Sequence, residues 1–179
     1  GDIVKPLDEE ALRKDLQDLV ARGVEAITIS FINSYANPVH EKRAKAIAQE
    51  MFPTLPITAS AEVLPEFREY ERALTAVMNS YVRPKVSLYV KNFAYQLTAH
   101  GLKAEVNILR SDAGLMTLRM AQERPVYAVM SGPAGGVAGA LFIATKAGFP
   151  HILTLDMGGT STDVALCQDG NQTISRETT

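Results

Sequence analysis

Two acidic residues enclose a glycine pair and three hydroxyl residues near the end of the chain, over residues 156–163. Apolar runs precede Asp156 and follow Asp163, so the pattern predicts a strand, a tight turn and a second strand. Gly158 and Gly159 lack a Cβ, which lets the turn backbone approach a ligand closely. Successive backbone N–H groups at such a turn can bind an anion. These residue types indicate a phosphate-binding turn.

Side chains in the same turn could assist a phosphate. The hydroxyl groups of Thr160, Ser161 and Thr162 could donate hydrogen bonds to it. Asp156 could hold a hydrated Mg²⁺ ion that neutralises phosphate charge. The alternative is an ordinary β-hairpin whose glycine pair only supplies the turn. The acids on both sides and the three hydroxyl residues favour the phosphate site.

A second glycine-rich stretch, Ser-Gly-Pro-Ala-Gly-Gly at residues 131–136, lies between an apolar run and a predicted helix. Free N–H groups and the dipole at a helix N-terminus both favour an anion, which makes Ser131, Gly132 and Gly135 candidate nucleotide-binding residues. Close packing of the helix through its glycines is an equally good explanation. The stretch is neither a Walker A loop nor a Gly-x-Gly-x-x-Gly motif.

Two other clusters have simpler explanations. In the run Arg-Glu-Tyr-Glu-Arg at residues 68–72, Arg68 and Glu71 can pair on one helix face, although an interface or substrate role stays open. His40 and Glu41 do not begin a metalloprotease motif, because Ala44 stands where the second histidine would be. The histidines are scattered, so no transition-metal site is supported.

Composition limits the function classes. The 179 residues are 46% apolar and 21% charged, which is typical of a globular protein. The net charge of −2 gives no electrostatic case for a nucleic-acid partner or an anionic membrane surface. The single cysteine, Cys167, excludes an internal disulfide and fits a cytoplasmic location. No signal peptide and no apolar run of transmembrane length is found.

Strand and helix patterns alternate along the chain, which predicts an α/β layer. The expected helices cover residues 8–22, 38–51, 65–100, 115–122 and 134–147, and the expected strands cover residues 24–32, 56–60 and 103–109, before the strand–turn–strand at 151–166. Asp8 is the expected N-cap of the first helix, and Gly23 suits its C-terminal end. Pro84 is expected to break or kink the long helix.

The stretch Asp156 to Asp163 resembles a phosphate motif of the actin/Hsp70/sugar-kinase ATPase superfamily. Its wording, Asp-Met-Gly-Gly-Thr-Ser-Thr-Asp, resembles more specifically the hydantoinase A / 5-oxoprolinase family, which also includes subunits of acetone and acetophenone carboxylases. The stretches at residues 131–136 and 68–72 are similar to the same family. The resemblance extends from about Leu7 to Leu166.

One loop departs from that resemblance. Relatives usually read Ser-Asn-Gly-Gly where this chain has Ser111-Asp112-Ala113-Gly114. Asp112 adds a charge, and Ala113 removes the freedom of glycine at positive φ. The departure leaves the ligand role of the loop open and is compatible with a different substrate.

The resemblance implies an α/β chain that is an internal fragment of an actin-like (ribonuclease H-like) ATPase fold, with a mixed sheet and flanking helices. Residues 1–150 would be the C-terminal part of the first lobe, with a helical insertion at about 65–100. Residues 151–179 would be the truncated start of the second lobe. A first Asp-x-Gly-Gly-Thr motif precedes this stretch in the family, so the fragment alone is expected to be inactive.

The resemblance also implies ATP- and Mg²⁺-dependent opening of a small cyclic amide, such as a hydantoin or 5-oxoproline, with a hydantoinase B–like partner subunit. Gly158, Gly159 and Thr160 would then contact phosphate, and Asp156 would hold Mg²⁺ through water. Asp163 and Thr162 would support the turn or orient a water, which makes Asp156 and Asp163 the candidate catalytic pair. Two alternatives remain: ATP-dependent carboxylation of a ketone, and a non-catalytic nucleotide-binding module.

Overall fold

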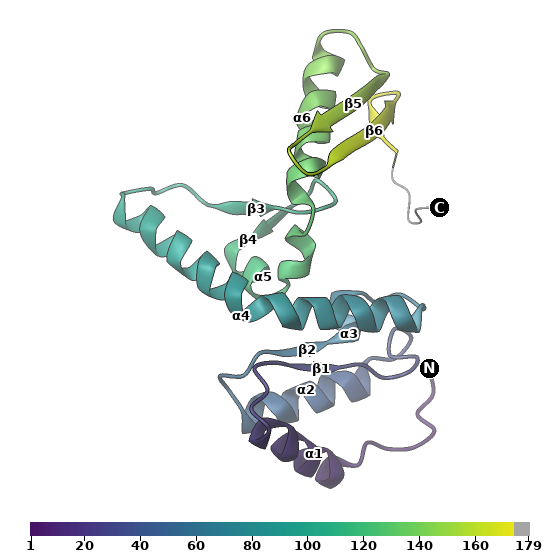
Figure 1. Cartoon of the computed structure of the whole chain (residues 1–179). Helices are drawn as coiled ribbons and strands as arrows, with labels where there is room; N and C mark the ends of the chain where they lie inside the picture. The colour runs from purple at the N-terminus through teal and green to yellow at the C-terminus, as the bar shows by residue number, and fades with distance from the viewer. Residues whose placement is uncertain (174–179) are drawn as a thin grey trace. The chain divides into compact units, whose positions relative to one another are not determined.

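The computed structural model describes residues 1–173, which divide into two compact units. Unit 1 contains Gly1–Lys103 and Arg119–Val126, and unit 2 contains Ala104–Leu118 and the chain from Tyr127 onward (Figure 1). The assignment of residues 1–150 and 151–179 to two lobes stays a prediction, and its last six residues lie outside the described part. No helix in residues 1–173 is both long enough and apolar enough to cross a membrane.

Unit 1 begins with a strand–helix–strand layer. Helix α1, Glu9–Ala21, starts at the predicted N-cap, because the Asp8 carboxylate accepts a hydrogen bond from the Ala11 N–H at 3.0 Å. Gly23, with φ of 80°, follows the helix as expected. Strand β1, Ile27–Ile29, pairs in parallel with β2, Ile57–Ala59, and helix α2, Val39–Met51, connects them.

The strand predicted over residues 24–32 is three residues long in the structure. Only Ile27–Ile29 finds a partner strand, and the backbone turns soon afterwards at Asn33, which has φ of 58°. The apolar run therefore located the strand but not its ends.

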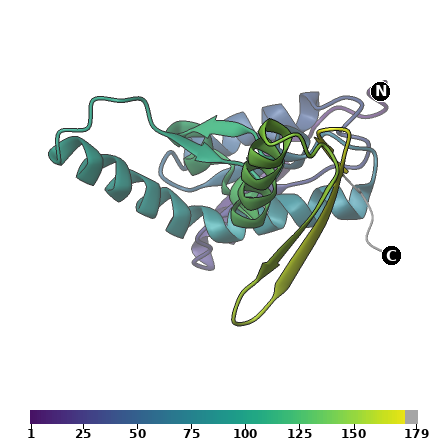
Figure 2. The ribbon, with the colours of Figure 1, turned by 90° about the horizontal axis from the view of Figure 1, so that it is seen from above.

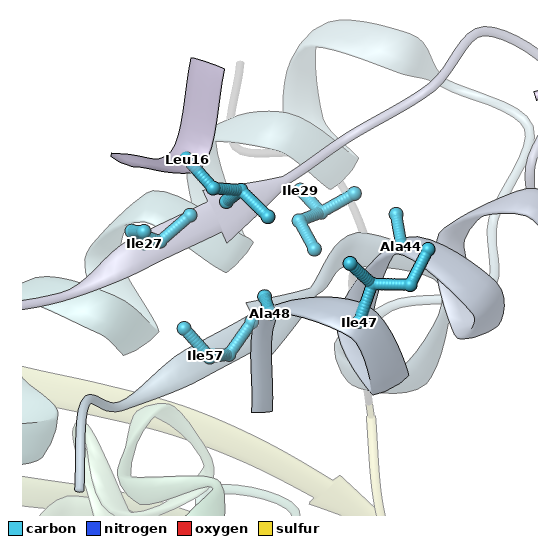
Figure 3. Close-up of a cluster of buried hydrophobic side chains, with 7 residues drawn as sticks. All are labelled: Leu16, Ile27, Ile29, Ala44, Ile47, Ala48 and Ile57. Carbon is cyan, nitrogen blue, oxygen red and sulfur yellow. The ribbon is translucent and has the colours of Figure 1, made fainter. Parts of the chain in front are cut away.

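The core of unit 1 lies between the strands and the first two helices. Figure 3 shows the buried apolar side chains of this cluster facing one another: Leu16, Ile27, Ile29, Ala44, Ile47, Ala48 and Ile57. Each of the four elements contributes at least one of them, so their mutual burial holds the layer together.

Two helices follow β2: the short α3, Ser60–Val63, and the long α4, Glu69–Ala99. α4 covers the side of the strands opposite α1 and α2 (Figure 1). Pro84 does not break α4, because the helix runs through it, so this alternative is wrong. Figure 1 shows α4 changing direction partway along its length, in keeping with the other alternative, a kink. Ser80 bonds Thr28 before the proline, at 2.6 Å, and Ser87 bonds the Gln122 carbonyl after it, at 2.7 Å. These contacts oppose the local cost of proline in a helix.

Strands β3, Asn107–Leu109, and β4, Leu115–Thr117, form an antiparallel pair in unit 2. The helix predicted over 115–122 is therefore wrong for its first three residues, and α5 covers only Leu118–Glu123. Leu115–Thr117 form a strand because they pair with β3, although their sequence also suits a helix. A short 3₁₀ helix, Pro125–Ala128, follows α5.

The buried side chain of Asn79, on α4, anchors the return of the chain to unit 1 at α5. Its amide nitrogen donates to Thr58 Oγ1 at 3.3 Å and to the Glu123 carbonyl at 3.2 Å. Its amide oxygen accepts from the Val126 N–H at 3.3 Å. One side chain thus joins β2, α4 and the segment after α5.

Unit 2 continues with helix α6, Ser131–Lys146, and strands β5, Ile152–Met157, β6, Thr162–Gln168, and β7, Asn171–Gln172. The three strands form an antiparallel sheet, so the predicted strand–turn–strand is confirmed. The β5–β6 hairpin crosses α6 (Figure 2). α6 begins at Ser131, earlier than predicted, so residues 131–136 form its first turns and are not a loop before it.

Candidate functional site

The turn between β5 and β6 has a defined register. Asp156 lies opposite Asp163, and Met157 lies opposite Thr162. The Gly158 N–H donates to the Ser161 carbonyl at 2.9 Å, which closes the turn over Gly158 to Ser161. All residues from Asp156 to Thr162 are exposed, so the backbone of the turn is accessible.

The conformation of the turn does not by itself require the glycine pair. Two-residue hairpin turns of type I′ use glycine because they need positive φ. Neither Gly158 nor Gly159 has a φ in the left-handed region, and a Cβ added to Gly159 would meet no atom within 4 Å. Positive φ therefore does not account for the glycine pair, and a contact of these glycines with a ligand stays a prediction.

The two acidic residues of the hairpin form a directly opposed pair. Asp156 is exposed and Asp163 is half-buried, and no hydrogen bond or ion pair within the described residues engages either carboxylate. Like charges opposite each other destabilise a sheet. A bound cation would relieve this repulsion, and carboxylate oxygens are ligands that suit Mg²⁺.

The structure brings the two glycine-rich motifs together within unit 2. A Cβ built on Gly136, in α6, would lie 4.0 Å from Asp156 Oδ2. Ser131 and Gly132 form the first turn of the same helix, and Gly132 has no atom within 4 Å of its Cβ position. Sequence reasoning did not select Gly136 as a site residue, although its place in a second glycine pair was a usable signal.

Gly135 has a packing role. A Cβ at this position would lie 2.4 Å from Leu109 Cδ2, so the glycine lets α6 lie against β3. At this residue the close-packing explanation is sufficient, and a contact with nucleotide stays a prediction.

We expect Gly135→Ala to destabilise unit 2 by about 1–3 kcal/mol, because the new methyl group must displace Leu109. Gly139→Ala is the matched control in the same helix, since its Cβ would meet nothing within 4 Å. Alanine there should stabilise the helix by up to about 1 kcal/mol. Thermal unfolding followed by circular dichroism would compare the two, and equal shifts would contradict the packing role.

The run at residues 68–72 divides into an exposed pair and a buried clamp. Arg68 and Glu71 pair at 3.6 Å, as predicted. The Arg72 side chain is fully buried in unit 1, and its guanidinium lies with Cζ 5.6 Å from the centre of the Tyr35 ring. It donates hydrogen bonds to four groups: Ser60 Oγ at 3.2 Å, the Glu66 carbonyl at 2.7 Å, the Phe31 carbonyl at 3.0 Å and the Glu69 carboxylate. Arg72 therefore ties the loops after β1 and β2 to α4.

Two carboxylates complete this clamp. Glu41, also fully buried, accepts from the Phe31 N–H at 2.7 Å, Ser60 Oγ at 2.7 Å and the Ala61 N–H at 2.8 Å. The Asn33 N–H, 3.0 Å from Glu69 Oε1, lowers the pKa of the Glu69 carboxyl, with help from Arg72. Sequence reasoning considered Glu41 only for a metal motif and missed this role.

The loop between β3 and β4 keeps a left-handed residue despite its departure from the family pattern. Ala113 has φ of 62°, a conformation that glycine adopts at lower cost. Asp112 Oδ1 accepts the Gly114 N–H at 3.0 Å, and this hydrogen bond is the main cause of a lowered pKa of the Asp112 carboxyl. Arg110 lowers it further.

Metal-binding groups are sparse elsewhere. Within residues 1–173 no three His, Cys, Asp or Glu side chains gather closely enough to hold a metal ion. Cys167 is buried at its place opposite Ile152. Asp156 and Asp163 supply only two carboxylates, so a cation held there would need further oxygen ligands from water or phosphate.

The chain is similar to known proteins over most of its length. The sequence model of the Hydantoinase/oxoprolinase family matches residues 72–179, and that of the Hydantoinase/oxoprolinase N-terminal region matches residues 1–52. The chain is 33% identical over 177 residues to the caprolactamase subunit alpha of Pseudomonas jessenii, covering 99% of this chain and 25% of that one. It is 33% identical over 171 residues to the 5-oxoprolinase of Saccharomyces cerevisiae, covering 94% and 13%.

Solved structures confirm the predicted α/β, ATPase-like fold of this family. The ATP-dependent caprolactamase from Pseudomonas jessenii superimposes with a TM-score of 0.85 at 34% identity, over 93% of this chain and 24% of that one. A nucleotide-free acetone carboxylase gives a TM-score of 0.81 at 30% identity, over 95% and 24%. The chain thus spans about a quarter or less of these relatives. With family models matching at both ends and this shared fold, the chain belongs to the hydantoinase/oxoprolinase family.

Proposed function

We propose that this chain is part of a subunit that opens a small cyclic amide by hydrolysis, coupled to the hydrolysis of ATP. The overall reaction adds one water across the ring amide, giving a free amine and a carboxylate, while ATP and a second water give ADP and phosphate. The observation that carries the proposal is the approach of Asp156, beside an exposed glycine turn, to Gly136 in the first turns of α6. Relatives named caprolactamase and 5-oxoprolinase supply the substrate class.

Each residue of the site has a proposed task. Backbone N–H groups of Gly158 and Gly159 and the Thr160 hydroxyl would contact the phosphates, assisted by the N-terminus of α6 at Ser131 and Gly132. Asp156 would hold Mg²⁺ through water, because its opposed partner Asp163 leaves excess negative charge there. Asp163 and Thr162 would support the turn or orient the attacking water. Phosphoryl chemistry requires mainly such positioning and charge neutralisation.

The relatives also suggest the setting of the reaction. Several are named as subunits, including caprolactamase subunit alpha and acetone carboxylase beta subunit, so we propose that a hydantoinase B–like subunit completes the enzyme. The single cysteine of the chain fits a cytoplasmic location.

The test is ATP-dependent ring opening by the full-length subunit together with its partner. Caprolactam and 5-oxoproline would be offered with ATP and Mg²⁺, and the amino acid product and free phosphate would be measured. We expect product to form only when ATP is present. ATP-dependent incorporation of bicarbonate into a ketone, with no amide opened, would replace this proposal by the carboxylase alternative. Nucleotide binding without turnover of any substrate would favour a non-catalytic module.

A further inference from the structure

Three side chains of unit 2 form a cluster that the proposed phosphate site does not use: Arg110, Asp112 and Tyr127, called here the Arg110 cluster. Arg110 Nε lies 3.1 Å from Asp112 Oδ1, and Arg110 Nη2 lies 2.7 Å from Asp112 Oδ2. The guanidinium lies 4.9 Å from the centre of the Tyr127 ring. The planar guanidinium of Arg110, called here its fork, thus lies over the Tyr127 ring and forms two hydrogen bonds to the carboxylate of Asp112, in the same loop.

The loop that carries this cluster is attached directly to the start of α6. The Ser111 N–H and hydroxyl both donate to the Tyr127 carbonyl at 2.8 Å. Leu109, just before the loop, packs against Gly135 of α6. Tyr127 lies four residues before Ser131, where α6 begins. The Arg110 cluster therefore flanks the helix end that carries the proposed phosphate contacts.

Asp112 has two tasks that can be separated. Its Oδ1 accepts the Gly114 N–H at 3.0 Å, which shapes the loop. An asparagine oxygen could accept the same hydrogen bond, so loop shape needs an acceptor but no charge. The charge of Asp112 instead neutralises Arg110.

The neutralised fork has a consequence for ligands. The side chains of Arg110 and Asp112 are 31% and 53% exposed, so a ligand can reach the pair. A carboxylate arriving there would have to displace Asp112 and would then face its negative charge. An uncharged amide ring meets no such repulsion.

We propose that the Arg110 cluster selects substrates by charge: with Asp112 on the fork, this subunit accepts an uncharged cyclic amide and disfavours one that bears a carboxylate. The proposal rests on the proposed function and specifies its substrate class. Arg110 and Asp112 are specificity-determining residues in it, and neither takes part in the chemical step.

The experiment compares caprolactam, which is uncharged, with 5-oxoproline, which bears a carboxylate, using the full-length subunit and its partner. Asp112→Asn should raise the ratio of kcat/KM for 5-oxoproline to that for caprolactam at least tenfold, mainly through KM. Adding Arg110→Gln to Asp112→Asn should cancel this gain, because the freed fork is lost. Asp169→Asn, at an exposed turn with His151 as its partner, is the control and should leave the ratio unchanged.

A ratio that does not change in Asp112→Asn, or a gain that persists after Arg110→Gln is added, would overturn the proposal. Calorimetry of 5-oxoproline binding to the parent protein and to Asp112→Asn distinguishes failure of the charge-selection proposal from failure of the proposed function. If neither amide is hydrolysed with ATP, the proposed function fails. In that case, tighter binding of 5-oxoproline by Asp112→Asn than by the parent protein would still support charge selection, and equal binding would refute it. Circular dichroism of each variant checks that the fold is retained.

Discussion

Replacing Arg72 by methionine should lower the free energy of unfolding of unit 1 by about 3–5 kcal/mol. The substitution leaves the carbonyl groups of Phe31 and Glu66 without the donor that now reaches them inside unit 1. It also removes the cation beside Glu69 and one hydrogen-bond partner of Ser60. Buried acceptors without a partner each cost about 1–3 kcal/mol, so the individual losses are consistent with that total. Urea denaturation followed by circular dichroism would measure the change.

Arg13→Met is the control for loss of an arginine charge in the same unit. Arg13 pairs with Glu50 at 3.4 Å on the surface, with its side chain 38% exposed. Its loss should change stability by no more than about 1 kcal/mol. If the Arg72 and Arg13 variants lost similar stability, the buried clamp would not hold the loops after β1 and β2.

Replacing Asp156 by asparagine should reduce the rate of ATP hydrolysis by the full-length subunit about 100-fold or more, the scale expected when one stabilising electrostatic contact is removed. Asparagine fits the same space on β5 but no longer carries the charge proposed to hold Mg²⁺. Asp156 is exposed and its carboxylate has no hydrogen-bond or ion-pair partner among the described residues, so we expect the variant to fold normally. Phosphate release under saturating ATP would be the measurement, with nucleotide affinity determined separately.

The matched control is again an Asp-to-Asn exchange at Asp169, at the other end of β6. Asp169 has φ of 53°, which asparagine also tolerates, so the change should be silent for ATP hydrolysis. Unchanged turnover in Asp156→Asn would remove this residue from the mechanism. A large loss in both variants would instead indicate damage to the hairpin.

Local sequence signals predicted many of the helices and strands, and contacts with other segments determined the boundaries that these signals missed. Asp8 caps α1 because its carboxylate needs only the next turn of the same helix. Leu115–Thr117 reads as helix but pairs with β3, a partner that is not evident from the run itself. α4 runs through Pro84 because contacts on both sides of the proline hold it. The strand at Leu115–Thr117 depends on pairing with a nearby segment of the chain, whereas the continuity of α4 depends on contacts with segments distant in the sequence.

In the candidate site, too, features set by local sequence could be predicted and contacts between elements could not. The hairpin and its opposed acids were readable from residues 156–163, since register follows from a short turn. The approach of Gly136 to Asp156 needs the packing of α6 on the hairpin, which no spacing encodes. Glu41 could have been found, because it falls on the same helix face as Ala44 and Ala48, which are buried. A charged residue in that stripe indicates a buried hydrogen-bond acceptor.

The division of the chain into units has a topological consequence for anyone who wishes to dissect it. The polypeptide passes from one unit to the other three times, after Lys103, after Leu118 and after Val126. Neither unit is therefore a contiguous stretch of sequence. Cutting after Lys103 would separate Asn79 from the carbonyl of Glu123 and the N–H of Val126, leaving a buried amide without those partners. A truncated first unit must keep residues 119–126. A single cut that keeps them also keeps residues 104–118, which belong to unit 2.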